Sequence, residues 1–139
     1  MLSRTAKHAL RATLVLAQTP RDQFRGAGSI AEEIRAPQNY LGKMLKTLAE
    51  RGVLVSQKGM GGGFQLAKSP EKITLYEVVE PFDHVSDWTG CLMGNGACSP
   101  DTPCALHHKA AYVRDEYVKM LRTSTLAEVA SPPAPVPPT

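Results

Sequence analysis

All three cysteines of this 139-residue chain lie in one short stretch, Cys91 to His108, together with two of its four histidines. Six residues separate Cys91 from Cys98, five separate Cys98 from Cys104, and His107 follows three positions after Cys104. Thiolates and a neutral imidazole are ligands for iron-sulfur clusters and for zinc. The spacing therefore predicts one metal centre held by these three cysteines and His107.

Two other interpretations of the cysteines stay open. A tetrahedral zinc ion suits the same three thiolates and one imidazole. Thiols can also sense oxidants directly, without any metal. An odd, clustered set of cysteines argues against a disulfide framework, which prefers an even count in a secreted chain. We favour the iron-sulfur cluster and keep zinc and direct thiol sensing as alternatives.

The charge of the chain is unevenly distributed. Residues 1–72 carry twelve Lys/Arg against five Asp/Glu, a net +7, whereas residues 73–139 carry four against eight, a net −4. A basic first half predicts contact with a polyanion, and nucleic acid is the first candidate. No leader peptide and no apolar run of membrane-spanning length is present, so we expect a cytoplasmic protein without membrane contact.

The first half has the pattern of a helix-turn-helix. Residues 3–18 show apolar positions at three- and four-residue intervals, which predicts an amphipathic helix. Ser29 and Glu32 have the spacing of a capping box and predict the start of a short second helix. Pro37 suits the first position of a third helix, which Gly52 closes.

The third helix separates its residues between two faces. The apolar face consists of Leu41, Met44, Leu45 and Leu48, and the small, polar and basic face of Asn39, Gly42, Lys43 and Lys46. Lysines can contact phosphates, and an amide such as Gln38 or Asn39 can pair with an adenine edge in the major groove. The helix alone is equally consistent with a solvated surface. The residues that follow it favour DNA.

Two short β-prone runs, 53–57 and 64–67, flank a glycine-rich turn and predict a hairpin. A helix-turn-helix followed by such a hairpin is a winged helix, with Lys58 placed to approach phosphates or the minor groove. The turn lacks the Lys-Ser/Thr ending of a phosphate-binding loop. The predicted DNA-contacting residues are Ser29, Gln38, Asn39, Tyr40, Lys43, Lys46, Lys58, Gly59 and Gly61.

The second half predicts a sensor loop and a dimerisation helix. A short helix from Thr74 ends at Pro81, and the Gly-, Asp- and Pro-rich loop that follows carries the cysteines. After Pro103, apolar residues in a regular four-three rhythm predict a long helix that pairs with a second copy, although part of its seam could instead pack on the first helix of its own chain. The members of this seam are Leu106, Ala110, Val113, Tyr117 and Met120, with Leu121 beside them.

The expected fold is mainly α with a small β-hairpin, a winged helix-turn-helix plus a long carboxyl-terminal dimerisation helix. We expect a DNA-binding domain over residues 1–80, a cysteine-bearing sensor loop over 81–103, a dimerisation helix and short end over 104–130, and a disordered Pro-rich tail over 131–139. Nothing resembles an assembled nucleophile, base and orienting acid, so we expect neither enzymatic activity nor a small-molecule substrate.

The order of these features resembles the Rrf2 superfamily of bacterial winged-helix transcription regulators, in particular its IscR- and NsrR-like members. The matching stretches are ALR in the first helix, SIAEEI and NYLGKMLKTLAERGVLVSQKG in the helix-turn-helix, GGGFQLAKSPEKITLYEVVE through the wing, the three cysteines, and LRTSTLAEV near the end. The resemblance covers nearly everything except the tail. It implies a homodimer that binds a double-stranded DNA operator and holds an iron-sulfur cluster.

The resemblance also implies the ligands of that cluster. Cys91, Cys98 and Cys104 match its cysteines, and His107 matches the histidine that completes a two-iron two-sulfur cluster in IscR-like members, with a four-iron four-sulfur cluster as the alternative. The first cysteine gap is one residue longer than in the IscR and NsrR types. Some relatives instead use an acidic side chain of the partner's first helix; here that place is Lys7, which cannot ligate while charged, and His8 stands next to it.

The resulting hypothesis is a transcription regulator whose operator affinity is controlled by a cluster that senses redox state, nitric oxide or iron supply. A regulator that senses oxidants directly through thiols is the first alternative. A small iron-sulfur or thiol redox protein that does not bind DNA is the alternative from another class. The basic first half and the predicted wing argue against that last alternative.

Overall fold

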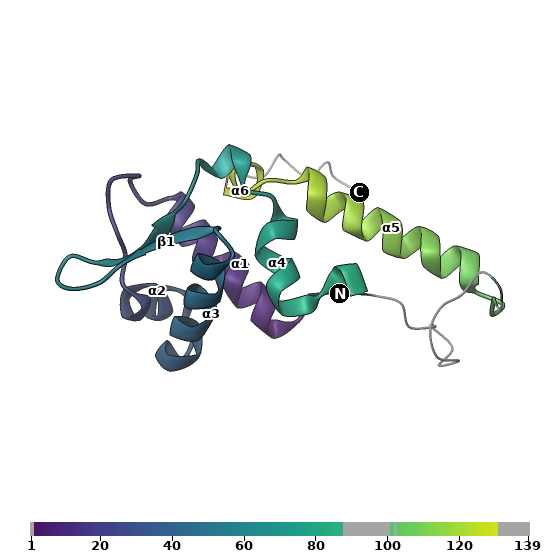
Figure 1. Ribbon diagram of the computed structural model, residues 1–139, viewed down its shortest axis with the longest axis horizontal. Coiled ribbons are helices and arrows are strands. Elements are labelled where there is room, and N and C mark those ends of the chain that lie inside the picture. The colour runs from purple at the N-terminus through teal and green to yellow at the C-terminus, as the bar shows by residue number, and fades with distance from the viewer. Residues whose placement is uncertain (1, 88–100, 102, 131–139) are drawn as a thin grey trace, which may run out of the picture.

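The computed structural model describes residues 2–87, 101 and 103–130. Within them the fold is mainly helical, with one two-stranded antiparallel hairpin (Figure 1). The elements are α1 (Arg4–Ala17), α2 (Ala27–Ile34), α3 (Gln38–Glu50), β1 (Leu54–Gln57), β2 (Gly63–Leu66), the 3-10 turns η1 (Pro70–Lys72) and η2 (Val85–Asp87), α4 (Leu75–Asp83), α5 (His107–Thr123) and α6 (Leu126–Ala130). The winged helix-turn-helix class predicted from the sequence is confirmed.

Helix α1 is the central element, because α2, α3, α4 and α6 all pack against it. Ser3 caps its amino end by accepting a hydrogen bond from the Ala6 amide at 3.0 Å. Ala6, Ala9 and Ala12 are fully buried, and their small side chains let neighbouring helices approach closely. The predicted helix over residues 3–18 is therefore correct to within one residue at each end.

Helix α2 begins earlier than the sequence predicted. Its N-cap is Gly26, with no side-chain cap, so the capping box expected from Ser29 and Glu32 is wrong. Arg25 instead donates to the Ser29 hydroxyl, with its Nη2 at 2.7 Å from Oγ. The physical reason is that the chain before α2 is held extended by the wing, and this lets the helix start directly at residue 27.

Helix α3 has the two faces that its sequence predicted. Leu41, Met44, Leu45 and Leu48 are all buried in the main core. Pro37 is the N-cap rather than the first helical residue, one position from the prediction. Because one side of α3 is buried in the core, its opposite side faces solvent.

The wing contains a pairing that local patterns did not predict. Besides the β1–β2 register, Arg25 pairs with Phe64 through two backbone bonds, from Arg25 N to Phe64 O at 2.9 Å and from Phe64 N to Arg25 O at 2.8 Å. Gly63 makes this approach possible, since its φ is +134° and a Cβ there would lie 2.3 Å from the Arg25 oxygen. The wing is thereby attached to the start of α2.

Helix α4 continues through the proline that was expected to end it. Thr74 and Glu77 form a complete capping box at its start. Pro81 lies inside the helix, which runs on to Asp83, because a proline in the last turn loses one donor but keeps a helical φ. His84 then closes the helix in a left-handed conformation, with its amide donating to the Glu80 carbonyl at 3.0 Å.

Helix α5 projects from the rest of the described chain, and its amino end is the part furthest from α1 (Figure 1). It begins at His107, three residues later than expected. Tyr117 and Leu121 are buried against their own chain, whereas Val113 and Met120 are 60% and 48% exposed. Part of the predicted seam therefore packs within the chain, mainly on α4 rather than on the first helix that the sequence suggested.

After α5 the chain returns to the core around α1 and α3. Leu126 of α6 is fully buried in the core that α1 and α3 share. Its amide donates to the Ile73 carbonyl at 2.9 Å, and Leu75 N donates to Ser124 O at 3.0 Å. The tail predicted over residues 131–139 lies outside the described residues. Among the described helices, no stretch is long and apolar enough to cross a membrane.

Candidate nucleic-acid interface and cysteine site

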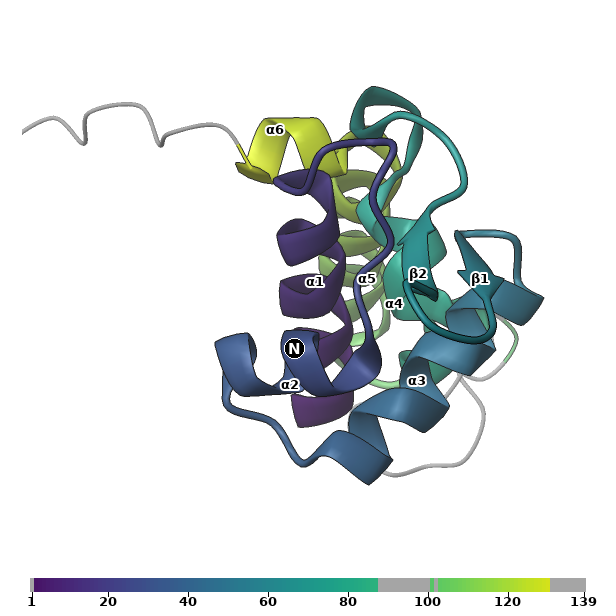
Figure 2. The ribbon, with the colours of Figure 1, turned by 90° about the vertical axis from the view of Figure 1, so that its left-hand side faces the viewer.

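The outer side of α3 and the start of α2 border an open groove of ≈ 440 Å³. The groove is lined by Ala27, Gln38, Asn39, Gly42, Lys43 and Lys46. Asn39, Lys43 and Lys46 are exposed, as the helical pattern predicted. Figure 2 views the molecule from the end where α2, α3 and the wing lie together. We call this end the reading face, consisting of the outer side of α3, the start of α2 and the wing turn.

Close packing between α2 and α3 positions the amide of Gln38. A Cβ on Gly28 would lie 3.1 Å from Gln38 Nε2, so the absence of a side chain there leaves room for the glutamine. Ala27 lies in van der Waals range of a Cβ built on Gly42, at 4.0 Å. Small residues on both helices therefore keep the groove open and leave the side chains of α3 as its main polar surface.

Two residues of the predicted DNA-contacting set have intramolecular partners. The Tyr40 hydroxyl donates to Thr5 Oγ1 at 2.8 Å, and its half-buried ring contacts the His8 ring with centroids 5.6 Å apart. Ser29 is exposed but accepts hydrogen bonds from Arg25. Tyr40 thus anchors α3 to α1 at the edge of the groove, and Ser29 orients an arginine.

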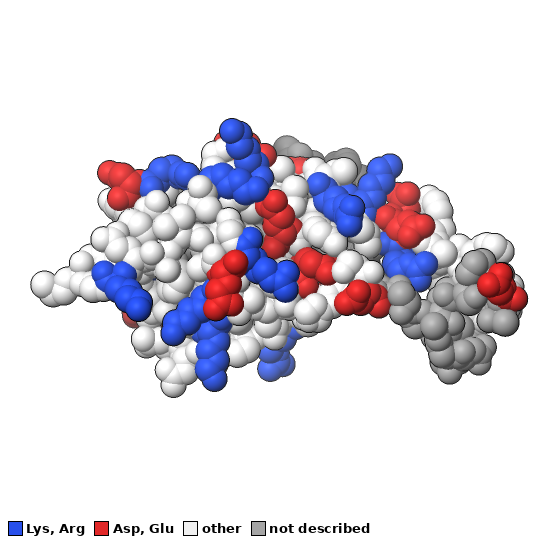
Figure 3. All heavy atoms as spheres, in the orientation of Figure 1, with Lys and Arg blue, Asp and Glu red and all other residues white. Residues whose placement is uncertain are grey.

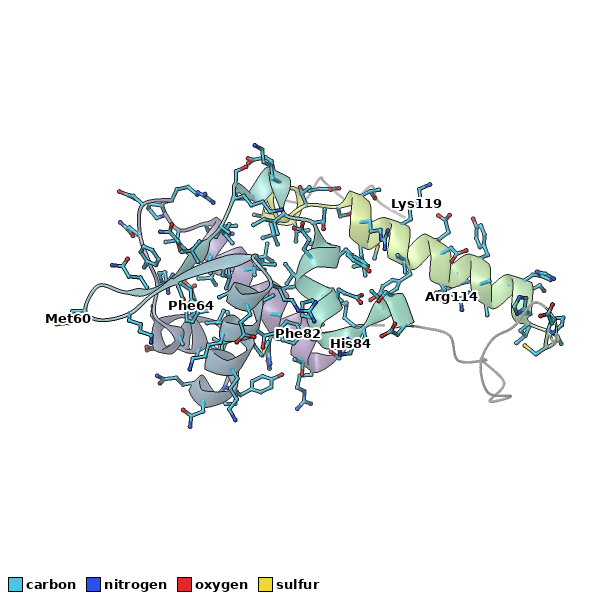
Figure 4. All side chains as sticks on the ribbon, in the orientation of Figure 1. Met60, Phe64, Phe82, His84, Arg114 and Lys119 are labelled. Atoms are coloured by element: carbon cyan, nitrogen blue, oxygen red, sulfur yellow. The ribbon has the colours of Figure 1, made fainter. Side chains whose placement is uncertain are left out.

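The wing turn extends beyond the helices. Lys58, Gly59 and Gly61 are exposed, and both glycines have positive φ, +93° and +75°. Between them Met60 is fully exposed at the tip, whereas Phe64 points back to the core (Figure 4). Met60 was not predicted as a site residue, because an apolar residue in a turn has no distinguishing local pattern.

Basic side chains gather on the reading face. Figure 3 shows Lys and Arg over α3 and beside the wing. Arg25 was also not predicted, although its guanidinium lies at the junction of the wing and α2, with Nη1 3.6 Å from a Glu33 carboxylate oxygen. In the sequence, the position of Arg25 just before the second helix is the feature that could have identified it. Arg25, Lys43, Lys46 and Lys58 thus place four of the twelve basic residues of residues 1–72 on or beside this face.

The described part of the cysteine site comprises the residues at the start of α5. Cys104 is half-buried with a free thiol, and its carbonyl accepts a hydrogen bond from the His107 amide at 3.1 Å. His107 is half-buried and His108 is exposed, with ring centroids 5.0 Å apart. The thiol and the imidazole predicted as ligands therefore lie within one turn of each other.

Cys91 and Cys98 lie outside the described residues, so the full ligand set is not placed. The described members have the donor chemistry that an iron-sulfur cluster needs, one thiol and one imidazole close in sequence and partly shielded from solvent. Among residues 2–87, 101 and 103–130, no group of three or more His, Cys, Asp or Glu side chains forms a metal site. Cys91 and Cys98, two of the predicted ligands, are not among these described residues.

A second, smaller core joins the amino end of α1 to α4 and α5. It contains Ala6, Val79, Val85, Tyr117 and Leu121. Burial raises the pKa of the Tyr117 hydroxyl, and the nearby Asp83 carboxylate raises it further. Both effects disfavour the phenolate. This core is the place where the turn leading to the cysteines meets the DNA-binding part of the fold.

The chain is similar to known transcription regulators over most of its length. It is 34% identical to a protein of Aquifex aeolicus assigned as an HTH-type transcriptional regulator, over 93% of this chain and 90% of the relative. It is 27% identical to the transcriptional regulator IscR of Cronobacter sakazakii, over 94% and 80%. The solved structure of CymR, the global cysteine regulator of B. subtilis, has a TM-score of 0.78 at 21% identity and covers 94% of this chain and 95% of its own.

A family model also matches this chain, over nearly its whole fold. Residues 2–132 match the model named Rrf2, described as an iron-dependent transcriptional regulator. This range includes the helices, the wing and the cysteine stretch. The family and the relatives are transcriptional regulators rather than enzymes, as the sequence predicted. The chain therefore belongs to the Rrf2 family of transcriptional regulators.

Proposed function

We propose that this protein is a homodimeric regulator whose affinity for a double-stranded DNA operator depends on an iron-sulfur cluster held by its own residues. Cys91, Cys98, Cys104 and His107 would hold the cluster. When bound, such a cluster supplies a centre that responds to redox state, nitric oxide or iron supply. The observation that carries the proposal is that Cys104 and His107, both half-buried, lie within one turn of each other at the start of α5, joined by a backbone hydrogen bond.

The DNA part of the proposal rests on the reading face. The groove presents the Gln38 and Asn39 amides in the first turn of α3, followed by Lys43 and Lys46, which suits base edges of a major groove and the phosphates beside it. Lys58 and the backbone of the glycine turn suit the neighbouring minor groove. Met60 at the tip has the apolar character of side chains that wedge between base steps there.

The homodimer rests on the uncovered apolar side of α5. Tyr112, Val113 and Met120 are 68%, 60% and 48% exposed. At about 100° per residue these three positions fall within one third of the helix circumference. The position of Tyr117 and Leu121 against α4 leaves this apolar side free for a second copy. We call these three residues the α5 seam.

The proposal is tested by purifying the full chain without oxygen from cells competent in cluster assembly. We expect a coloured protein with iron and acid-labile sulfide in similar amounts. A colourless protein without iron would reject the proposal, and bound zinc in place of iron would favour the zinc site instead. Loss of operator binding on thiol oxidation of an iron-free protein would favour direct thiol sensing.

His107 and His108 provide a matched pair for the fourth ligand. His107→Ala should change the absorbance spectrum or shorten the lifetime of the cluster, because an imidazole ligand is removed. His108→Ala should leave both unchanged, since one helical position turns its side chain by about 100°. An unchanged spectrum in His107→Ala would assign the fourth ligand to another residue.

A further inference from the structure

One carboxylate connects the turn that leads to the cysteines with the amino end of α1. Asp83, the last residue of α4, accepts a hydrogen bond from the Ser3 amide at 3.0 Å and another from the Ser3 hydroxyl. The same hydroxyl accepts from Ala6 N and so caps α1. The first turn of α1 is thus held by a residue eighty positions away in the sequence.

The turn after Asp83 is held equally firmly. His84 has a left-handed backbone, φ +48° and ψ +48°, which is uncommon for a residue with a side chain. The amide and hydroxyl of Ser86 both donate to the Glu80 carboxylate, the amide at 3.1 Å. Val85 is 2% exposed and packs with Ala6 of α1 and Tyr117 of α5. The turn over residues 84–87 is therefore bonded to α4 and packed against α1 and α5.

From the first turns of α1 the contacts continue to the reading face. Thr5 accepts the Tyr40 hydroxyl bond at 2.8 Å, and the His8 ring meets the Tyr40 ring edge to face. The Nδ1 of His8 is buried and has no hydrogen-bond partner among the described residues. Tyr40 lies in the first turn of α3, next to Asn39 and one turn before Lys43. The position of that turn thus depends on the first two turns of α1.

We infer that Asp83 is a positioning residue. It transmits the position of the turn that follows it, residues 84–87, through Ser3, Thr5 and Tyr40 to the start of α3. This inference deepens the proposed function and rests on it for its biological role. The structural link itself depends on neither DNA nor a metal. It is made of hydrogen bonds to a half-buried carboxylate and of one tyrosine contact, each of which a single substitution removes.

The link is tested by amide hydrogen exchange on the purified full chain without metal. In Asp83→Asn we expect amides of the first turn of α1 to exchange on the order of tenfold faster, because hydrogen bonds to a charged acceptor are lost. Amides at the start of α3 should exchange several-fold faster, and those of the wing strands should not change. Asp87→Asn, an exposed carboxylate in η2, is the matched control and should leave all three regions unchanged.

Two further variants test whether the faster exchange at α3 arises through the Tyr40 contact or from a general loss of stability. Tyr40→Phe should speed exchange at the start of α3 without affecting the cap of α1. In the double variant with Asp83→Asn, the effect at α3 should be smaller than the product of the single effects. Faster exchange confined to α1, or independent effects at α3, would overturn the inference. If Asp83→Asn does not fold, Ser3→Ala removes the hydroxyl bond to Asp83 together with the cap on Ala6 N, and exchange at the start of α3 is then the deciding readout.

Operator binding distinguishes this inference from the proposed function. In the wild type, cluster-loaded and empty protein should differ in operator affinity. In Asp83→Asn both forms should still bind DNA, and the ratio of their affinities should move several-fold toward one. Equal affinities in the wild type would reject the proposed function, and the exchange result would still decide the role of Asp83. An unchanged ratio in Asp83→Asn would reject its coupling role.

Discussion

The region that carries the reading face and helix α5 differ in how much of their apolar surface is buried within the chain. The DNA-binding part buries a continuous core to which α1, α2, α3, the wing, α4 and α6 all contribute. Of the seventeen residues of α5, only Tyr117 and Leu121 are buried, and both lie in its second half. The first part of the molecule therefore satisfies its own packing, and the second presents apolar surface that another chain could cover.

This difference separates a region with a closed core from a helix with exposed apolar residues. A surface used to read DNA must keep its side chains at fixed spacing, which a closed core provides. Helix α5 has one predicted ligand, His107, as its first residue, and its exposed apolar side is the surface that we propose a second copy covers. The Asp83 link connects the two parts through α1.

If the DNA-binding part holds its own core, a cavity there should have the largest effect on stability. Leu45 is fully buried, and Leu45→Ala should lower the free energy of unfolding by about 2–5 kcal/mol. Val113→Ala, at an exposed position of α5, should have a much smaller effect in monomeric protein. Urea unfolding at fixed protein concentration measures both. Equal decreases in the free energy of unfolding for Leu45→Ala and Val113→Ala would contradict this distinction between the two regions.

If the α5 seam is a dimer contact, charge placed on it should separate the subunits. Val113→Glu with Met120→Glu should raise the dimer dissociation constant by about a hundredfold, because buried charges would face each other without partners. Sedimentation equilibrium measures this, and the helical circular dichroism should be retained. Val55→Glu, at an exposed valine of the wing strand, is the matched control. An unaffected dimer in the double variant would place the interface elsewhere.

If the reading face binds DNA, its lysines should govern the salt dependence. Lys43→Gln with Lys46→Gln should weaken operator binding and reduce the slope of log affinity against log salt by about two. Lys72→Gln, in η1 outside the groove, should change the slope little. Fluorescence anisotropy over a range of salt concentrations provides the measurement. An unchanged slope in the double variant would reject this face.

The smallest expected effect concerns the contact between α5 and the core. The pKa of Tyr117 is raised in the folded state by burial and by Asp83, so above about pH 10 the unfolded chain loses this proton first. Stability should therefore be unaffected by this group below pH 10 and should fall as the pH rises toward the folded pKa. Tyr117→Phe should reduce that alkaline loss in thermal unfolding. An identical alkaline slope would place the hydroxyl in a water-like environment.

Local patterns in the sequence predicted much of the reading face. The 3.6-residue periodicity of α3 assigned Leu45 to the core and Lys43 and Lys46 to the surface, because the period alone fixes which side chains share a face. The glycine-rich turn predicted the wing, and Thr74 predicted the start of α4. These features depend on residues close together in the sequence.

Long-range contacts were the part that the sequence could not predict. Arg25 pairs with Phe64, and that pairing displaced the expected Ser29 cap. Asp83 binds Ser3 across most of the chain, and no periodicity reports such a contact. Helical spacing identified the apolar residues of α5, but it could not tell which of them pack on α4 and which remain exposed.

The most direct test of the account is operator affinity measured on one preparation before and after removal of the cluster. We predict that the loaded dimer and the empty dimer bind the same operator with affinities that differ by about 5–150-fold, the range of typical coupling between two sites. The Cys104→Ser variant should show a single affinity under both treatments. Equal affinities of the loaded and empty wild-type protein would contradict the account.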